Sequence, residues 1–205
     1  MIAFPDRGLY GITQTGKTAE ALFDAVAAAI QGGAAAIQYR DKNPANAPYV
    51  ARELVKLCHE HNIPLIINDD VELALSAKAD GVHLGKDDSE IIAARYRLGS
   101  SAIVGISCYN DLDRALNAQN LGATYVAFGR FFNSGSKPLA ASADIDTLRQ
   151  AQAALHVPIV AIGGILPENG GQLISAGADL LAVIGGVFDR DPEQSALAFQ
   201  HLFDT

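Results

Sequence analysis

Three polar side chains with the means to hold an anion, Gln38, Arg40 and Lys42, follow a short apolar run in this chain. Side chains alternate between the two faces of a strand, so these three are expected to point the same way. Two cations and an amide on one side of a strand end form a good anion site. Tyr39 and Asp41 lie between them and complete the segment.

Polar groups or glycines also follow most of the other short apolar runs. These endings are Asn68-Asp69, Gly85 to Asp88, Ser107, Ser134 to Lys137, Gly163-Gly164 and Gly185-Gly186. When many strands offer chemistry at one common end, the pattern is typical of a (β/α)8 barrel, whose active site lies at the carboxyl ends of the strands. The sequence therefore predicts an α/β fold of the TIM-barrel type.

Alternating strand and helix patterns support this fold. The predicted strands cover residues 9–13, 34–39, 64–68, 81–84, 103–107, 125–129, 159–163 and 180–184. They are apolar on both faces, as buried parallel strands are. The predicted helices cover residues 19–31, 47–61, 71–78, 89–98, 111–120, 144–155, 170–175 and 193–203. We expect one barrel domain over residues 1–205.

Two carboxylates at neighbouring strand ends, Asp69 and Asp88, are candidate ligands for Mg²⁺, which prefers oxygen ligands. Capping is the alternative for each of them, because aspartate before a helix accepts hydrogen bonds from the first backbone amides. Asp69 or Asp70 would cap one helix, and Asp87 or Asp88 the next.

Glycine pairs end the last two predicted strands, at Gly163-Gly164 and Gly185-Gly186. Glycine lets backbone N–H groups approach an anion closely, and the loops after strands seven and eight of this barrel often bind phosphate. The alternative is that these glycines only form turns. The long segment 130–142 contains Lys137 and is either a flap over the site or a simple connector.

Composition excludes several classes of protein. The chain has 205 residues, a net charge of −8 and 49% hydrophobic residues. An acidic surface disfavours nucleic acid as a partner. No apolar run approaches the length of a membrane span, and no signal segment is evident, so we expect no membrane partner and a cytoplasmic location. Cys58 and Cys108 lack metal-ligand spacing and are expected to be reduced thiols.

The strand-end motifs, taken in chain order, resemble those of thiamine phosphate synthases. The matching segments are 38–42, 67–69, 81–88, 105–107, 134–137, 162–165 and 183–185. The resemblance implies an Mg²⁺-assisted transferase of thiamine biosynthesis. It would join hydroxymethylpyrimidine diphosphate to thiazole phosphate by a dissociative substitution and release pyrophosphate. A homo-oligomer is compatible with the sequence.

The resemblance also implies residue roles. Gln38, Arg40, Lys42 and Asn68, with the intervening Tyr39 and Asp41, would hold the pyrimidine diphosphate, and Asp69 and Asp88 would bind Mg²⁺. Ser107 would contact the same substrate and Lys137 its diphosphate, which makes Arg40, Lys42, Ser107 and Lys137 the catalytic set. Ser134, Gly135, Ser136, Gly164, Ile184 and Gly185 would hold the thiazole phosphate.

The chain departs from the usual family residues at four positions, Lys86, Ser134, Ser136 and Gly185. The family often has threonine at positions 134 and 136, serine at 185 and glutamine at 86. A related thiazole tautomerase would need a histidine soon after Ser107, which this chain lacks. A sugar-phosphate epimerase would need paired histidines, and only His83 lies in a strand, with its facing undecided. A non-catalytic sensor of thiamine precursors would not need the two carboxylates.

Overall fold

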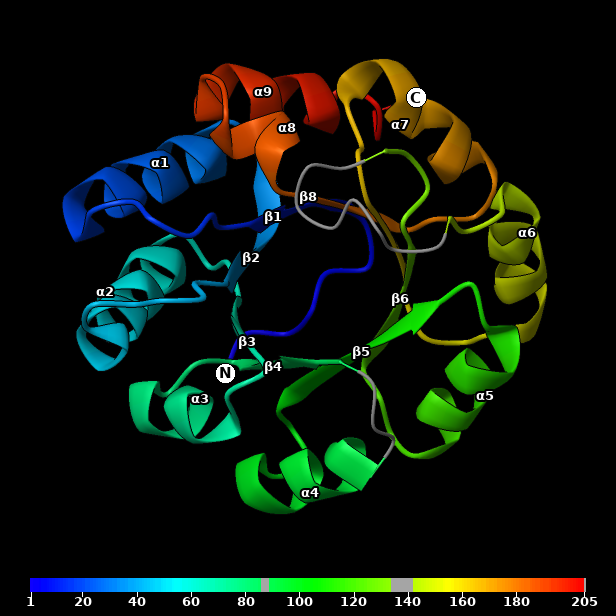
Figure 1. Cartoon of the computed structure of the whole chain (residues 1–205), viewed down its shortest axis with the longest axis horizontal. Coiled ribbons are helices and arrows are strands. Elements are labelled where there is room, and N and C mark those ends of the chain that lie inside the picture. Colours follow the sequence, from blue (N-terminus) through cyan, green and yellow to red (C-terminus); the bar gives the residue numbers. More distant parts are fainter. Residues whose placement is uncertain (86–88, 134–141, 205) are drawn as a thin grey trace.

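The computed structural model describes residues 1–85, 89–133 and 142–204. Eight parallel strands close into a barrel in sequence order, β1 pairing with both β2 and β8. Helices form a ring around the barrel (Figure 1). The predicted TIM-barrel fold is confirmed.

The strands are β1 (Gly8–Ile12), β2 (Ala34–Tyr39), β3 (Leu65–Asn68), β4 (Gly81–Leu84), β5 (Ile103–Tyr109), β6 (Tyr125–Gly129), β7 (Ile159–Ile162) and β8 (Leu180–Val183). Each overlaps a predicted strand. β5 runs two residues beyond its predicted end, and its pairing with β6 is irregular between Ser107 and Tyr109. Ser107 therefore lies within β5, two residues before its end.

The helices are α1 (Ala19–Gln31), α2 (Ala47–Glu60), α3 (Val71–Ala77), α4 (Ser89–Leu98), α5 (Leu112–Asn120), α6 (Ile145–Ala154), α7 (Pro167–Ser175), α8 (Gly185–Phe188) and α9 (Pro192–Gln200). The short helix α8 was not predicted. It begins at the Gly185-Gly186 pair, so the second glycine pair opens a helical turn directly after β8.

Two apolar layers result from strand alternation. In β2, Ile37 and Tyr39 lie in the outer core between the strands and the helices, whereas Ala36 lies in the inner core inside the barrel. Aromatic side chains fill much of the inner core. Phe4, from the segment before β1, stacks on Tyr125 with ring centroids 4.1 Å apart. The N-terminal segment therefore contributes to the barrel interior.

A polar cluster anchors the start of the chain beside the strand β4. The fully buried Asp80 accepts hydrogen bonds from the backbone amides of Ile2 and Leu65 and contacts the His59 ring at 2.8 Å. Several hydrogen bonds satisfy a buried carboxylate that would otherwise be strongly unfavourable in the apolar interior. Cys58 and Cys108 are buried free thiols, as expected.

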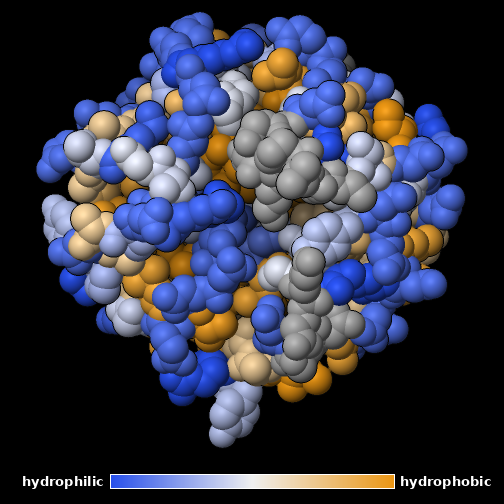
Figure 2. Space-filling model, viewed as in Figure 1, coloured by the Kyte–Doolittle hydropathy of each residue, from blue (hydrophilic) through white to orange (hydrophobic). Residues whose placement is uncertain are grey.

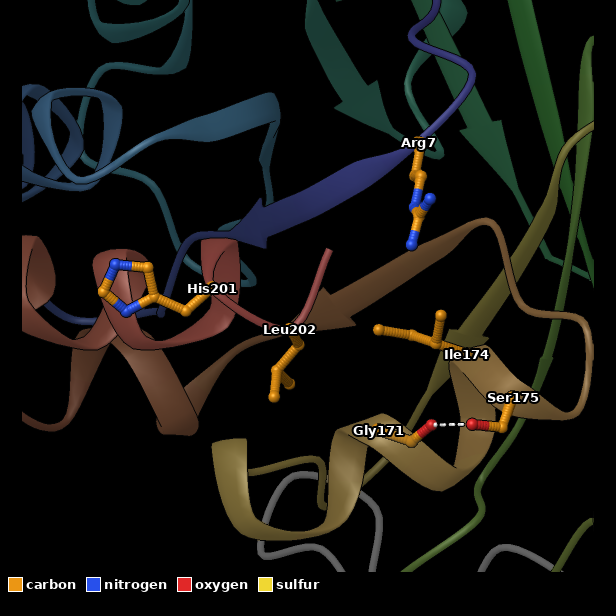
Figure 3. Close-up of a pocket in the computed structure, with 6 residues that line it drawn as sticks. All are labelled: Arg7, Gly171, Ile174, Ser175, His201 and Leu202. Atoms are coloured by element: carbon orange, nitrogen blue, oxygen red, sulfur yellow. Dashed lines mark hydrogen bonds between the residues drawn. The ribbon is translucent and has the colours of Figure 1, made fainter. Parts of the chain in front are cut away.

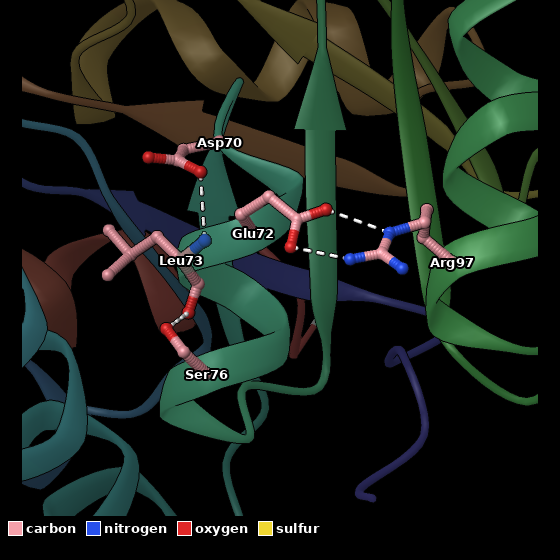
Figure 4. A network of polar contacts seen from close by, with 5 residues as sticks. All are labelled: Asp70, Glu72, Leu73, Ser76 and Arg97. Atoms are coloured by element: carbon pink, nitrogen blue, oxygen red, sulfur yellow. Dashed lines mark hydrogen bonds and ion pairs between the residues drawn. The ribbon is translucent and has the colours of Figure 1, made fainter.

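Helix α3 is fixed at its start and along its side (Figure 4). Asp70 is its N-cap residue and accepts from the backbone amide of Leu73 at 2.8 Å. Arg97 of α4 forms a bidentate ion pair with Glu72, in which two guanidinium nitrogens donate to the two carboxylate oxygens at 2.8 and 2.6 Å. The pair joins the helices that follow β3 and β4, and its exposure means that it adds little to stability.

Candidate active site

Two threonines after β1 hold the backbone of the predicted anion site. The Thr13 hydroxyl accepts from the Arg40 amide at 2.9 Å and donates to the Arg40 carbonyl at 3.1 Å. The Thr15 hydroxyl accepts from the Lys42 amide at 3.1 Å. β2 ends at Tyr39, so these contacts, rather than strand alternation, place Arg40 and Lys42. Thr13 and Thr15 were missed by the sequence argument.

Tyr39 and Asp41, which alternate with Gln38, Arg40 and Lys42, do not share the surroundings of those residues. The Tyr39 side chain lies in the outer core, where burial, with a smaller effect from Asp41, raises its pKa to about 12. Its phenol is thus directed away from the barrel interior, and its backbone is the part available at the strand end. The Asp41 carboxylate accepts from the Asn43 amide at 3.0 Å and shapes the following turn.

Gln38 lies inside the barrel, where it begins a line of hydrogen bonds. Its side-chain amide donates to the Tyr10 hydroxyl at 2.9 Å, and the Tyr10 and Tyr125 hydroxyls are 2.8 Å apart. The Tyr125 hydroxyl is 2.9 Å from His83 Nδ1, and His83 Nε2 is 3.0 Å from Ser107 Oγ. The structure thus connects Gln38 with Ser107 through three residues that the sequence argument did not assign.

Asp69 does not cap the helix that follows β3. Asp70 caps α3, whereas the backbone of Asp69 adopts a left-handed conformation with φ of 63°. The Asp69 amide donates to the His83 carbonyl at 2.8 Å, and its carboxylate accepts from the Asn68 side chain at 2.7 Å. An aspartate in this uncommon conformation, exposed at a strand end, points to a role other than capping.

The first glycine pair is required by the local backbone. Gly163 and Gly164 have φ of 106° and 63°. A Cβ atom on Gly164 would lie 2.4 Å from the Asn133 carbonyl oxygen, so the segment after β6 packs directly on this turn. These glycines are therefore needed for the turn.

In the second glycine pair, Gly185 lies against the Asp189 side chain. A Cβ atom on Gly185 would lie 2.3 Å from an Asp189 carboxylate oxygen, and Asp189 also accepts a hydrogen bond from the Gln14 side chain. The Asp189 carboxylate thus occupies the space that a serine side chain would need at position 185. Ile184 packs against the inner core at the same strand end.

Five expected site residues lie outside the described residues: Asp88, Ser134, Gly135, Ser136 and Lys137. Lys86 and Asp87 lie there too. Within the described part of the chain, no three histidine, cysteine, aspartate or glutamate side chains gather as a metal site. Asp69 is the described carboxylate of the expected metal pair.

Arg114 is a further cation beside Ser107 that the sequence argument missed. Its guanidinium donates to the Ser107 carbonyl at 2.9 Å and to the Gly85 carbonyl at 3.4 Å. It therefore links the ends of β4 and β5. It is the third residue of α5, and its sequence context offers no motif that distinguishes it from an ordinary surface arginine.

Hydrophilic residues lie around the barrel axis on the face shown in Figure 2. A surface cavity of about 410 Å³ lies elsewhere, lined by Arg7, by residues of α7 and by the two residues that follow α9 (Figure 3). Arg7 directly precedes β1, so this cavity is at the opposite end of the barrel from the predicted mouth. Within the described residues, no helix is long and apolar enough to cross a membrane.

Comparison with known proteins agrees with the fold and the motifs. The sequence model of the family described as thiamine monophosphate synthase matches residues 9–187. Thiamine-phosphate synthase of Nitrosococcus oceani is 52% identical over 96% of this chain and 93% of that protein. Its counterpart from Thiobacillus denitrificans is 48% identical over 99% and 97% of the two chains.

A solved structure is similar over nearly its whole length. Thiamine phosphate pyrophosphorylase from Pyrococcus furiosus superposes with a TM-score of 0.86 at 31% identity, covering 97% of this chain and 96% of that one. The ordered strand-end motifs, the closed barrel and these relatives agree: the chain belongs to the thiamine monophosphate synthase family.

Proposed function

We propose that this barrel mouth joins hydroxymethylpyrimidine diphosphate to thiazole phosphate, giving thiamine phosphate and pyrophosphate. The pyrimidine carbon loses its bond to the diphosphate oxygen, and the thiazole nitrogen supplies the electron pair of the new C–N bond. Both electrons of the broken bond leave with the pyrophosphate. The family membership and the cations placed beside β2 support this reaction.

Arg40 and Lys42 would bind the diphosphate and stabilise the negative charge that grows on it as the bond breaks. Such preorganised charges act without reorganising during the reaction. Lys137 would add a third cation. Gln38, Asn68 and Ser107 would hold the rest of the same substrate, with the backbone at Tyr39 and Asp41. No general base is needed for a dissociative substitution, because the thiazole nitrogen carries no proton to remove.

Asp69 and Asp88 would hold Mg²⁺. The described half of this pair fits that role, because Asp69 is exposed and does not cap α3. A bound Mg²⁺ would neutralise part of the diphosphate charge. Asn68, which donates to the Asp69 carboxylate, would orient that ligand.

The thiazole phosphate would lie on the opposite side of the mouth, against Gly164, Ile184 and Gly185, with Ser134, Gly135 and Ser136 beside it. The left-handed turn at Gly164 and the start of α8 at Gly185 support this proposal, because glycine lets backbone amides approach an anion closely. Both substrates are small molecules. We also propose that residues 1–205 act as one domain and that the protein works in the cytoplasm. A homo-oligomer is compatible with this function.

The observation that most strongly supports these roles is the fixation of the Arg40 backbone by Thr13, since it holds the backbone of a cationic residue at the end of β2. The test is the single-turnover rate of Arg40→Gln with both substrates saturating. A fall of about 10²–10³-fold is expected if the cation stabilises the transition state. Lys56→Gln on α2 is the charge-matched control. An unchanged rate with weaker diphosphate binding would reduce Arg40 to a binding residue.

A further inference from the structure

We propose that Tyr10, Tyr125 and His83 are positioning residues, which form a directional hydrogen-bond chain through the barrel interior and make the Ser107 hydroxyl a donor toward the substrate. The inference rests on the proposed contact between Ser107 and the pyrimidine diphosphate. It adds three residues from β1, β6 and β4 that act from below the mouth.

The chain is continuous, and its first three members are shielded from water, whereas His83 and Ser107 are half-buried. Its four successive contacts, from Gln38 through Tyr10, Tyr125 and His83 to Ser107, measure 2.9, 2.8, 2.9 and 3.0 Å. Tyr10, Tyr125 and Gln38 are at most 2% exposed. Hydrogen bonds in such an interior are electrostatically stronger than in water, and neighbouring bonds polarise one another.

Both phenols are neutral. Burial raises the pKa of Tyr10 and of Tyr125 far above the ordinary tyrosine value. Each hydroxyl therefore carries one hydrogen and donates one hydrogen bond. Their rings are also fixed, because Phe4 stacks on Tyr125 and meets Tyr10 edge to face. The hydroxyl positions are thus set by apolar packing.

The number of available hydrogens gives the chain a direction. The distance between the two hydroxyls allows either tyrosine to be the donor. Because the Gln38 amide already donates to Tyr10, we assign the Tyr10 hydrogen to its other partner, Tyr125. The Tyr125 hydrogen is then assigned to His83 Nδ1, so that each buried hydroxyl hydrogen has an acceptor. An imidazole that accepts at Nδ1 carries its proton on Nε2. Nε2 then donates to Ser107 Oγ, and the Ser107 hydrogen is left to point toward the mouth.

The consequence is chemical. A hydroxyl whose oxygen already accepts a bond from His83 is oriented to donate its own hydrogen to an acceptor on the substrate. The opposite polarity would begin at Ser107, which would donate to His83 and offer the substrate only an acceptor. The direction of the chain therefore determines which kind of substrate atom Ser107 can bind.

The first test uses the substrate-free protein labelled with ¹⁵N in its histidines. We expect His83 to show a protonated Nε2 and an unprotonated, hydrogen-bonded Nδ1. In Tyr125→Phe, which keeps the stacked ring, Nδ1 loses its donor and the proton is expected to populate both nitrogens. A proton on Nδ1 in the unaltered protein would reverse the chain and overturn the proposal. This readout is independent of the reaction.

The second test asks whether Tyr125 acts through Ser107. Tyr125→Phe is expected to lower kcat by about tenfold, the effect of one neutral hydrogen bond, with little change in KM for either substrate. In a Ser107→Ala background the same change should have no further effect. Tyr96→Phe, on the surface of α4, is the control. Equal effects of Tyr125→Phe in both backgrounds would contradict the positioning role.

Failure of the proposed function would look different, because the unaltered protein would then form no thiamine phosphate while the His83 tautomer stayed as described.

Tyr10→Phe provides a second variant should Tyr125→Phe fail to fold. It removes the donor to Tyr125, so it is expected to shift the His83 proton in the same direction but less. An unchanged tautomer in Tyr10→Phe would show that Gln38 and Tyr10 do not set the direction, and it would overturn the chain as proposed.

Discussion

The Asn68 side-chain amide donates a hydrogen bond to the Asp69 carboxylate over 2.7 Å, at the end of β3. The contact orients a carboxylate whose backbone is left-handed and whose neighbour, Asp70, caps the following helix. Capping and the proposed metal binding are thus divided between two adjacent aspartates, which makes the two roles separable by mutation.

Asp69→Asn is expected to abolish most Mg²⁺-dependent turnover while leaving stability nearly unchanged. Asparagine tolerates the left-handed conformation, so the change removes the charge without the backbone strain that Asp69→Ala would add. Asp70→Asn is the matched control, since asparagine caps a helix as well as aspartate does. Turnover should be measured across a Mg²⁺ titration. Equal Mg²⁺ dependence in both variants would exclude Asp69 as a ligand.

Thr13→Val is expected to weaken diphosphate binding and to lower the free energy of unfolding by about 1–3 kcal/mol. The fully buried Thr13 satisfies both the amide and the carbonyl of Arg40, and valine would leave both without that partner. Thr13→Ser keeps the hydroxyl and should recover most of the binding. Denaturant unfolding and the KM for the pyrimidine substrate measure the two effects. Normal substrate binding by Thr13→Val would show that this contact does not position Arg40.

Gly164→Ala is expected to destabilise the protein by about 1–3 kcal/mol, because alanine is strained at a left-handed position and its Cβ would meet the Asn133 carbonyl. Gly171→Ala is the opposite case. Gly171 lies within α7 with no atom near the position of a Cβ, so alanine should stabilise the helix by about 0.5–1 kcal/mol. Thermal unfolding of both variants compares them directly, and similar stabilities would contradict the described turn.

Stability is expected to fall above pH 9. Burial, with a smaller effect from Asp80, raises the pKa of the Cys58 thiol from 9.0 to about 12. Between these values the unfolded chain releases the thiol proton and the folded chain keeps it, so rising pH favours unfolding. Cys58 alone should contribute a slope of about 1.4 kcal/mol per pH unit. Urea unfolding across this range measures the slope, and Cys58→Ala should reduce it. An equal slope in that variant would assign the effect to other groups.

The sequence predicted the barrel well because periodicity and glycine-bounded helix ends repeat along the whole chain. Every predicted strand and helix is present, with ends shifted by a few residues, for example where the caps Asp111 and Asp144 lie outside the helix. Helix α8 was missed because its four residues are too few to show a helical period and begin with two glycines.

The interior of the site was harder to predict. A signal for His83 did exist: Val82 and Leu84 lie in the outer core, and apolar alternation in β4 directs His83 inward. Its partners Tyr125 and Ser107 are distant in sequence, and only the closed barrel brings their side chains together. Likewise, Thr13 at the end of the first predicted strand and Thr15 just after it show no sign of their roles until β1 is placed beside β2.

The most direct test of the proposed reaction is pyrophosphate and thiamine phosphate formation by the purified protein with both substrates. We expect the two products in equal amounts when Mg²⁺ is present, and loss of both after chelation with recovery on adding Mg²⁺ back. Pyrophosphate release at the same rate without Mg²⁺ would contradict the metal role assigned to Asp69 and Asp88. Failure to form thiamine phosphate with both substrates and Mg²⁺ present would contradict the reaction itself.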